Sequence, residues 1–334
     1  MTGIGTVAAL EFRLRLQTGR WRWLLGSWFV VLALIAMLIR LAVREDVVGS
    51  EVVSYTGSFM FGGLMLVVLG LALLISPTLA SQSVNGDRER GTLAPLQITN
   101  LTSWDLTLGK LVASWGTALV FLLVTTPLAV WCLFEGGLSV GRVVVVYAVM
   151  ALLMGVVCAL ALGLSAWTGR TTTSSVLSYL TVFALTAGTA IVFGLLLAVT
   201  ADTVEDQVTG QTYSYTQSRP DRIWWILAPN PFIVLADAAP ETPTTTIRLP
   251  DGTLVESRQD ADLLGALSQE ARLLRQRPEV FIPGNEVPAS PAEPGPVWPY
   301  GLGFRLVLAA GALLLTERRL RTPAGVLPTG QRVA

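Results

Sequence analysis

The sequence predicts an all-α integral membrane protein with six transmembrane helices, and three observations lead to this fold class. Of the 334 residues, 52% are hydrophobic and only 14% are charged, whereas about a quarter of an ordinary soluble domain is charged. Six runs of mostly apolar residues reach the length of about 20 that a helix needs to cross a bilayer. Basic residues gather in alternate connections between these runs, as they do in membrane proteins. A soluble core could not bury this much apolar surface.

The six apolar runs are expected to span the membrane as helices. A charged residue at the centre of a bilayer costs about 2.5 to 3.5 kcal/mol on insertion scales, and the second, fourth and fifth runs contain none. The first five spans lie within residues 23–199, and the sixth follows a long polar stretch. The expected spans are residues 23–43, 58–79, 106–133, 143–167, 175–199 and 298–316.

The distribution of basic residues predicts that both termini, including the tail at 317–334, are cytoplasmic. Short cytoplasmic loops carry more Lys and Arg than short outside loops. With the N-terminus inside, the outside loops carry only Arg44 and Arg142, with Arg40 at the outer end of the first helix. The inside set is Arg13, Arg15, Arg20, Arg22, Arg88, Arg90, Lys110, Arg170, Arg318, Arg319, Arg321 and Arg332.

Residues 200–297 are expected to form a small, mixed extracytoplasmic insertion between helices five and six. This stretch holds fourteen acidic and seven basic residues. Residues 223–232, with two Trp and two Pro, indicate an interfacial or re-entrant element. Residues 244–257 indicate a hairpin that turns at Pro-Asp-Gly. Residues 263–274 have the spacing of a short amphipathic helix, and the proline-rich residues 278–299 indicate an extended connector.

Residues 1–22 are expected to form an amphipathic helix on the cytoplasmic leaflet, in contact with membrane lipids. Val7, Leu10, Leu14 and Trp21 fall roughly on one helical face, and four arginines lie nearby. This helix either anchors and orients the first span or contacts a partner protein. The pattern does not choose between these roles.

The composition argues against catalysis, a bound cofactor, a metal site or nucleic-acid binding in this chain. The sequence contains no histidine, which is the commonest metal ligand and general base. Cys132 and Cys158, the only cysteines, both lie in apolar runs. The formal net charge is zero, so there is no basic footprint for nucleic acid. No paired acids or nucleophile with a base are visible in the spans, as an intramembrane enzyme would need.

The connection between the second and third spans, residues 81–109, carries a charged turn. A glycine in it permits a sharp chain reversal, and the following threonine can cap a short helix. Thr102 and Asp105 then form a T-x-x-D capping box before the third span. An ordinary solvated loop is the alternative interpretation. The residues of the turn are Asp87, Arg88, Glu89, Arg90, Gly91, Thr92 and Leu93.

This turn resembles a motif of the ABC transporter permeases of the ABC type-two family, which has the form E-R-E-x-G-T-L-E-x-L followed by G-K. Here it stands at residues 87–96, with Gly109 and Lys110 downstream. The sequence departs from the motif at Asp87 and Ala94, which stand where the motif has Glu. Residues 229–232 (Pro-Asn-Pro-Phe) and 317–321 (Glu-Arg-Arg-Leu-Arg) are also similar to this family.

The resemblance implies a permease subunit of an ABC exporter in a bacterial cytoplasmic membrane. Such a subunit pairs with a second permease chain, as a homodimer or heterodimer, and residues 81–109 couple it to cytoplasmic ABC ATPase subunits. The chain has no G-x-x-x-x-G-K-[ST] phosphate loop, so ATP is expected to be bound and hydrolysed by the separate ATPase. The apolar spans favour an amphipathic or lipid-like substrate. The rival hypothesis is a membrane-anchored structural or sensor protein that works through residues 200–297.

Two features inside the spans have more than one interpretation. Arg305 lies one or two turns inside the outer end of the sixth span, and an ionisable residue there indicates a functional site in the substrate pathway. We expect instead that its side chain snorkels to the outer headgroups. Gly155, Ala159 and Gly163 recur every four residues in the fourth span, and this small-residue face allows close approach of another helix. Packing within the chain is favoured over a dimer contact.

Overall fold

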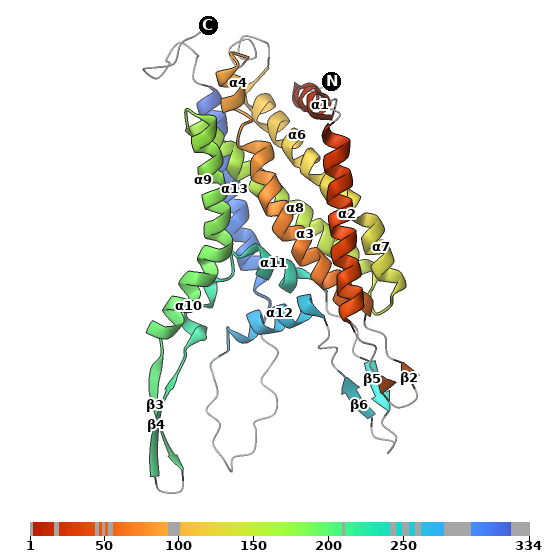
Figure 1. Cartoon of the computed structure of the whole chain (residues 1–334). Helices are drawn as coiled ribbons and strands as arrows, with labels where there is room; N and C mark the ends of the chain where they lie inside the picture. The colour runs from red at the N-terminus through yellow and green to blue at the C-terminus, as the bar shows by residue number, and fades with distance from the viewer. Residues whose placement is uncertain are drawn as a thin grey trace.

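The computed structural model of the chain is a bundle of long helices with short elements at both ends (Figure 1). It describes residues 3–16, 20–43, 47–48, 51–52, 56–92, 101–208, 211–240, 245–248, 254–257, 262–276 and 295–321. In this part of the chain, six helices are long and apolar enough to cross a membrane, which confirms the predicted fold class. They are Trp21–Ala42, Thr56–Glu89, Ser103–Phe134, Val140–Trp167, Thr171–Val199 and Trp298–Leu320.

Several of the spans are divided into shorter segments. The third span breaks at Thr125, because Pro127 in the first turn of the next segment has no backbone N–H to donate. The segments are α2 (Arg20–Ala42), α3 (Thr56–Ala80), α4 (Asn85–Glu89), α6 (Ser103–Val124), α7 (Thr126–Phe134), α8 (Val140–Trp167), α9 (Thr171–Phe183), the π-helical turn η1 (Ala184–Gly188), α10 (Thr189–Val199) and α13 (Trp298–Leu320).

The core of the bundle is built around α3 and α8. Of the most apolar 18 residues of the second span, 61% are buried, whereas none of those of the fifth span are. Met60 and Leu64 of α3 and Met150 and Leu153 of α8 have no exposed surface. The apolar side chains of the fifth span, such as Leu195 at 66% exposure, face outward. This is the arrangement expected where lipid rather than water surrounds a helix.

The small-residue face of α8 packs within the chain, as predicted. A Cβ atom added to Gly163 would lie only 2.7 Å from the Cβ of Ala312 in α13. Ala159 of α8 and Ala309 of α13 are buried in the same cluster. Because these residues are small, the two helix backbones approach closely.

The first helix, α1 (Gly3–Leu16), lies against the start of α6. A Cβ atom added to Gly109 would lie 2.7 Å from the Cβ of Val7, which is buried. The predicted helix over residues 1–22 is wrong in extent, because α1 ends at Leu16 and Trp21 belongs to α2. Of the predicted apolar face, Val7 is buried and Leu10 is 55% exposed. The contact with α6 runs from Gly3, which lies beside Asp105, to Glu11, which pairs with Lys110.

At the other end of the bundle, short elements follow the fifth span. Their bounds are β3 (Asp202–Val208), β4 (Gln211–Gln217), η2 (Pro220–Arg222), η3 (Trp224–Ile226), α11 (Pro231–Ala238), β5 (Thr245–Arg248), β6 (Leu254–Ser257) and α12 (Leu263–Leu273). A two-residue pair, β1 (Val47–Val48) and β2 (Glu51–Val52), lies between α2 and α3. We call this end of the molecule the α12 end, and the opposite end, where α1 and α4 lie, the α4 end (Figure 1).

The α12 end contains the predicted elements and one that was missed. β5 and β6 pair antiparallel, which confirms the hairpin within 244–257, although its turn residues lie outside the described part. α12 confirms the predicted helix, with Leu264 and Ala271 buried, but Leu263 of the predicted apolar face is 37% exposed. The connector predicted at 278–299 lies outside the described residues as far as 294. The antiparallel pair β3–β4 was not predicted.

Buried charges tie the α12 end to the bundle. Arg142, which was predicted in an outside loop, lies in the first turn of α8 and pairs with Asp262. Both side chains are 2% exposed. Asp237 of α11 accepts hydrogen bonds from the backbone nitrogens of Val297 (2.5 Å) and Trp298 (2.7 Å), so it caps the start of α13. α8 begins earlier than predicted because Ser139 caps it.

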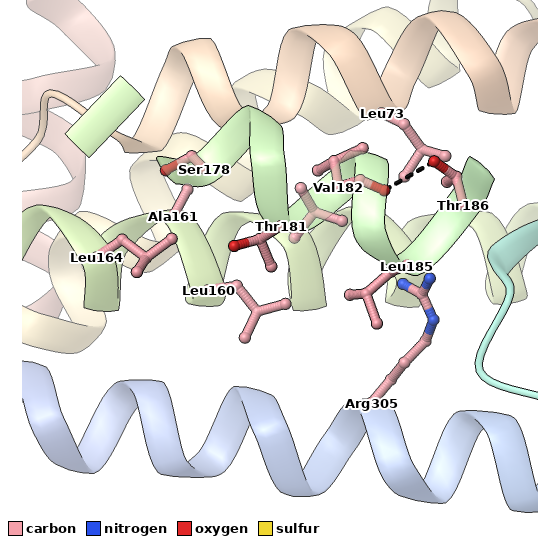
Figure 2. Close-up of a pocket in the computed structure, with 11 residues that line it drawn as sticks. Leu73, Leu160, Ala161, Leu164, Ser178, Thr181, Val182, Leu185, Thr186 and Arg305 are labelled. Carbon is pink, nitrogen blue, oxygen red and sulfur yellow. Dashed lines mark hydrogen bonds between the residues drawn. The ribbon is translucent and has the colours of Figure 1, made fainter. Parts of the chain in front are cut away.

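The middle of the fifth span forms a π-helical turn, η1, which was not predicted (Figure 2). A π-helical turn disturbs the regular hydrogen-bond ladder of a helix. Here the side-chain amide of Asn230 donates to the carbonyl oxygen of Thr186 at 2.9 Å and to the hydroxyl of Thr189 at 3.0 Å. Asn230 also caps α11 by accepting from the backbone nitrogen of Phe232. The predicted element at 223–232 therefore braces the fifth span.

Candidate functional site

The charged turn predicted from the sequence lies at the α4 end, beside α1 and the last turns of α13 (Figure 1). After α3 ends at Ala80, four turn residues lead into α4, and Arg90, Gly91 and Thr92 follow. The structure describes six of the seven predicted site residues. Leu93 lies outside the described residues.

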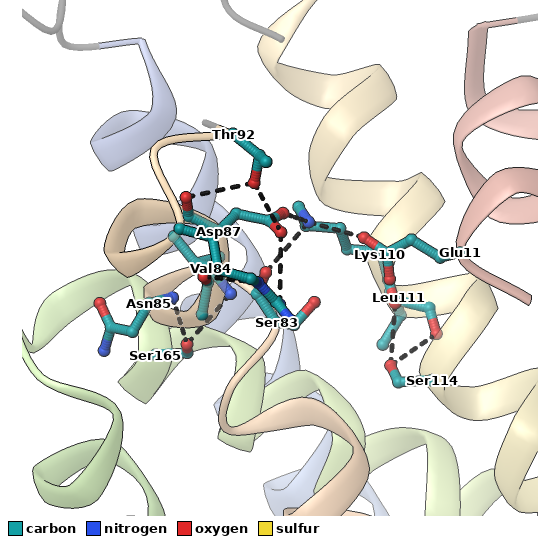
Figure 3. A network of polar contacts seen from close by, with 12 residues as sticks. Glu11, Ser83, Val84, Asn85, Asp87, Thr92, Lys110, Leu111, Ser114 and Ser165 are labelled. Atoms are coloured by element: carbon teal, nitrogen blue, oxygen red, sulfur yellow. Dashed lines mark hydrogen bonds and ion pairs between the residues drawn. The ribbon is translucent and has the colours of Figure 1, made fainter. Parts of the chain in front are cut away.

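Lys110 of α6 is at the centre of a group of polar contacts at the α4 end (Figure 3). We call Lys110 and its partners Glu11, Ser83 and Asp87 the Lys110 cluster. The Nζ of Lys110 donates to Glu11 Oε1 of α1 at 2.6 Å and to the carbonyl oxygen of Ser83 at 3.0 Å, and it forms an ion pair with Asp87 of α4. The side chain is 1% exposed. A buried ammonium is tolerated when it is paired and hydrogen-bonded. The only lysine of the sequence thus joins three elements.

Asp87 is directed toward the bundle. Besides Lys110, its carboxylate accepts a hydrogen bond from the hydroxyl of Thr92 at 3.2 Å and lies 3.6 Å from the guanidinium of Arg90. The Thr92 hydroxyl also lies 3.2 Å from the Asp87 carbonyl oxygen. The helix that Thr92 was predicted to cap falls in residues 93–100, outside the described residues. What the structure shows is that Thr92 closes the turn onto Asp87.

Arg88 links α4 to the connection between α8 and α9. Its guanidinium donates to the side-chain oxygen of Asn85 at 3.0 Å and to the carbonyl oxygen of Thr168 at 3.1 Å. Asn85 is fully buried, and its amide donates to the hydroxyl of Thr168 at 2.9 Å. The backbone nitrogens of Val84 and Asn85 both donate to the hydroxyl of Ser165 at 3.2 Å. Side chains of α4 and side chains at the end of α8 therefore both contribute to the contact between these helices.

Glu89 caps the fifth span. Its carboxylate accepts from the backbone nitrogen of Thr171 at 3.0 Å and from the Thr171 hydroxyl at 2.9 Å. A carboxylate at a helix N-terminus satisfies a free N–H and interacts favourably with the helix dipole. Glu89 is exposed, so it remains accessible at the surface while it orders the start of α9.

The tip of the turn is exposed. The side chain of Arg90 is 71% exposed, and Gly91 and Thr92 are exposed as well. Gly91 has a φ of 70°, a backbone conformation that favours glycine, which confirms the predicted chain reversal. The turn thus has an inner part, from Asp87 to Glu89, that is bound to the bundle, and an outer tip that is free to contact another molecule.

The predicted capping box at the start of α6 is present. The Thr102 hydroxyl accepts from the backbone nitrogen of Asp105 at 3.1 Å, and the Asp105 carboxylate accepts from the backbone nitrogen of Thr102 at 3.0 Å. Next to it, Ser103 donates to Glu317 of α13 at 2.9 Å. Glu317 is 3% exposed and also pairs with Arg321. The first turn of α6 is therefore tied to the last turn of α13.

Side chains connect α4 with several other elements. α4 is joined through side chains to α1, α6, α8 and α9, so a displacement of α4 would act on all of them together. Among the residues that the structure describes, no three His, Cys, Asp or Glu side chains come together as a metal ion would require. The contacts of Lys110 and Glu11 were not predicted from the sequence. The signals were that Lys110 is the only lysine and Glu11 the only acidic residue before Glu45.

Arg305, the other predicted site residue, lies far from this cluster. It is 1% exposed, and its Nε donates to the carbonyl oxygen of Pro229 at 2.6 Å. The prediction that it snorkels to the headgroups is wrong, because the side chain points from α13 into the bundle, toward η1 (Figure 2). The Pro-Asn-Pro break before α11 leaves a carbonyl there that the arginine binds.

A comparison with known protein families identifies the family of this chain. A family model described as ABC-2 family transporter protein matches residues 6–243. The chain belongs to the ABC-2 transporter family. A search for similar curated proteins gave no match. As an ABC-2 permease, the chain is the membrane component of a transporter, a multi-pass membrane protein whose family works with an ABC ATPase subunit. The matched region contains Glu11, the charged turn and Lys110, whereas Arg305 lies beyond it.

Proposed function

We propose that this ABC-2 permease is the membrane subunit of an ATP-driven exporter of the bacterial cytoplasmic membrane, and that its α4 end receives the movement of a separate cytoplasmic ATPase. The observation that carries this proposal is the Lys110 cluster. Its ion pairs hold α1, α4 and α6 together beneath an exposed tip.

The inner and outer parts of the turn have different tasks in this proposal. Arg90, Gly91 and Thr92 form the contact surface for the ATPase, because they are exposed at the end of the bundle. Asp87, Arg88 and Glu89 pass the movement on, because each is bonded to another helix. A solvated loop without a task would not need three consecutive charged residues bonded to three different elements.

The transported molecule is proposed to be amphipathic or lipid-like and to move outward. The spans are apolar, and the fifth span exposes apolar side chains along its length. ABC ATPases work as pairs, so we propose that two permease chains, either two copies of this chain or this chain and a related one, share two ATPase subunits. We propose that ATP is bound by the separate ATPase, and the lack of a phosphate-binding loop in the sequence supports this.

The alternative is a structural or sensor protein that works through residues 200–297. The packing favours the transporter, because Arg142 of α8 pairs with Asp262 at the start of α12, and Arg272 of α12 pairs in turn with Asp237 of α11. A sensor would lose its function when β5–β6 is deleted and would be indifferent to changes in α4.

The test is the association of the permease with its ATPase after charge reversal at the tip. The permease is co-expressed with candidate ABC ATPases from its own genome, and the complex is quantified by pull-down and by ATP hydrolysis in vesicles. Arg90→Glu should weaken association about tenfold or more, since interface charge pairs are commonly worth more than 1.4 kcal/mol. Glu270→Arg, a charge reversal at an exposed position of α12, is the control and should change nothing. Equal association of both variants with the ATPase would reject the proposed contact.

A further inference from the structure

A pocket lies between the fifth and sixth spans, away from the α4 end (Figure 2). The space that the protein itself encloses is small, about 10 Å³, and it continues into open space at the side of the bundle. α8 contributes four lining residues, α9 and η1 contribute five, and α3 and α13 contribute one each. The lining residue of α13 is Arg305.

Arg305 carries a buried charge whose two terminal nitrogens have no partner. Its Nε is bonded to Pro229, but neither NH1 nor NH2 has a hydrogen-bond acceptor among the described residues. No described carboxylate forms an ion pair with it. A guanidinium does not lose its proton in a protein. The pocket therefore contains a permanent positive charge that the rest of the described structure leaves uncompensated.

An uncompensated buried charge is costly, and native structures rarely keep one without a reason. The two free nitrogens of Arg305 are the pair that binds a carboxylate or phosphate in a bidentate way. The missing partner is therefore best supplied by an anionic group of one of these two kinds.

The remainder of the pocket is apolar and elongated. Its wall on the fifth span runs from Ser178 to Thr186, which is about 12 Å at 1.5 Å per residue. The hydroxyls of Ser178, Thr181 and Thr186 donate to carbonyls of their own helix at 2.7, 2.8 and 2.7 Å, so they add little charge or hydrogen-bond demand. The other side chains are aliphatic. The chemistry of this wall suits an alkyl chain that lies along it from the open side.

We infer that this pocket binds an amphipathic anion, with its carboxylate or phosphate on Arg305 and one apolar chain along α8 and α9. The half-buried residues Leu160, Thr181 and Leu185 border the open side of the pocket, and their side chains would have to move for the anion to reach the buried nitrogens of Arg305. The π-helical turn η1 shapes the end of the pocket that faces the arginine. This inference rests on the proposed function only in naming the class of cargo.

The test is photo-labelling of the full chain in bilayers of neutral phosphatidylcholine. The probe is dodecanoate with a diazirine at the end of its chain, and labelled peptides are identified by mass spectrometry. We expect labelling of α8 and α9 near Leu164 and Ser178, where the chain end would lie. Unlabelled dodecyl phosphate should compete, whereas dodecyltrimethylammonium, a cation of equal chain length, and inorganic phosphate, a head group without a chain, should not.

Two variants test the charge of Arg305 and the apolar wall of the pocket separately. Arg305→Met should lower labelling about tenfold or more, because charge-assisted hydrogen bonds contribute about 1.5 to 3 kcal/mol. Thr181→Trp should lower it by filling the pocket while leaving Arg305 in place. Arg40→Met, which removes an arginine that pairs with Glu135 near the same end of the bundle, is the matched control and should label normally.

The inference would be overturned by unchanged labelling in folded Arg305→Met and Thr181→Trp, or by equal competition from the cation. Competition by inorganic phosphate at the same concentration would overturn the amphipathic part. No ATPase is present in this assay, so its failure would leave the proposed coupling untouched. A failure of ATPase binding at Arg90 would likewise leave the pocket untouched.

Discussion

Lys110 and Arg305 are two basic residues of spanning helices, and each is only 1% exposed. They differ in how many of their polar atoms have a partner. Lys110 has two carboxylates and a carbonyl oxygen around one ammonium. Arg305 has one carbonyl oxygen for three nitrogens. Burial of a charge therefore has two uses in this molecule. A satisfied charge joins helices, and an unsatisfied one marks a place for a ligand.

Arg142 is intermediate between these two cases, because its charge has a partner but its hydrogen bonds are incomplete. Its Nε and NH1 have no partner among the described residues, yet its NH2 pairs with Asp262. Its charge is therefore compensated although its hydrogen bonds are incomplete. A ligand is needed only where the charge itself lacks a partner, and this singles out Arg305 among these three residues.

The largest expected effect concerns the sides of the membrane on which the two ends of the bundle lie. A cysteine at Arg90 should react with an impermeant maleimide only after the cells are permeabilised, whereas one at Glu270 should react in intact cells. The physical reason is the excess of basic residues in the loops of the α4 end. The wild-type chain is the unlabelled control, because Cys132 and Cys158 are fully buried. Labelling of both positions in intact cells would refute the orientation.

The next effect is on stability. Lys110→Met removes the buried cation that pairs with Glu11 and Asp87, and breaking a buried pair costs about 3 to 5 kcal/mol. Both carboxylate side chains are 18% exposed, so we expect about 3 kcal/mol. Arg305→Met should cause no comparable loss, since it removes a charge that has no counter-ion. The measurement is the unfolding of both variants in the same detergent by thermal and denaturant titration.

A second substitution sharpens this comparison. Asp87→Asn combined with Lys110→Met should recover part of the lost stability, because it removes one of the two carboxylates that pair with Lys110. If Lys110→Met and Arg305→Met destabilise the chain equally, the distinction between a joining charge and a ligand-binding charge is wrong.

Local patterns predicted much of the fold. The six spans follow from apolar length, and the capping box of Thr102 and Asp105, the β5–β6 hairpin and α12 follow from residues within a few positions of one another. The missed hairpin β3–β4 had a weaker local signal, since Tyr213 and Tyr215 alternate with polar residues after Thr209-Gly210, whereas the segment before it is mostly polar. The π-helical turn had none, because one extra residue in a turn hardly changes the apolar pattern.

The site was predicted less completely, because it depends on contacts between distant residues. Lys110 and Glu11 are 99 residues apart, and Glu89 meets Thr171 across 82 residues. The resemblance assigned the loop to coupling but gave no role to its individual charged residues, whereas the structure bonds three of them to other parts of the bundle. Arg305 was expected to snorkel because depth alone can be read from a sequence, while the direction of a side chain within a bundle cannot.

The central claim is that the Lys110 cluster transmits the work of the ATPase, and Glu11→Gln tests it most directly. Glu11 is on α1, away from the exposed tip and from the pocket, so the change should alter neither ATPase binding nor ligand binding. In vesicles that hold the complete transporter, the amount of labelled amphiphile exported per ATP hydrolysed should fall about tenfold, as loss of one charge-assisted hydrogen bond of about 1.5 kcal/mol would allow. The rate of hydrolysis should be retained. An unchanged ratio of export to hydrolysis in this variant would contradict the account.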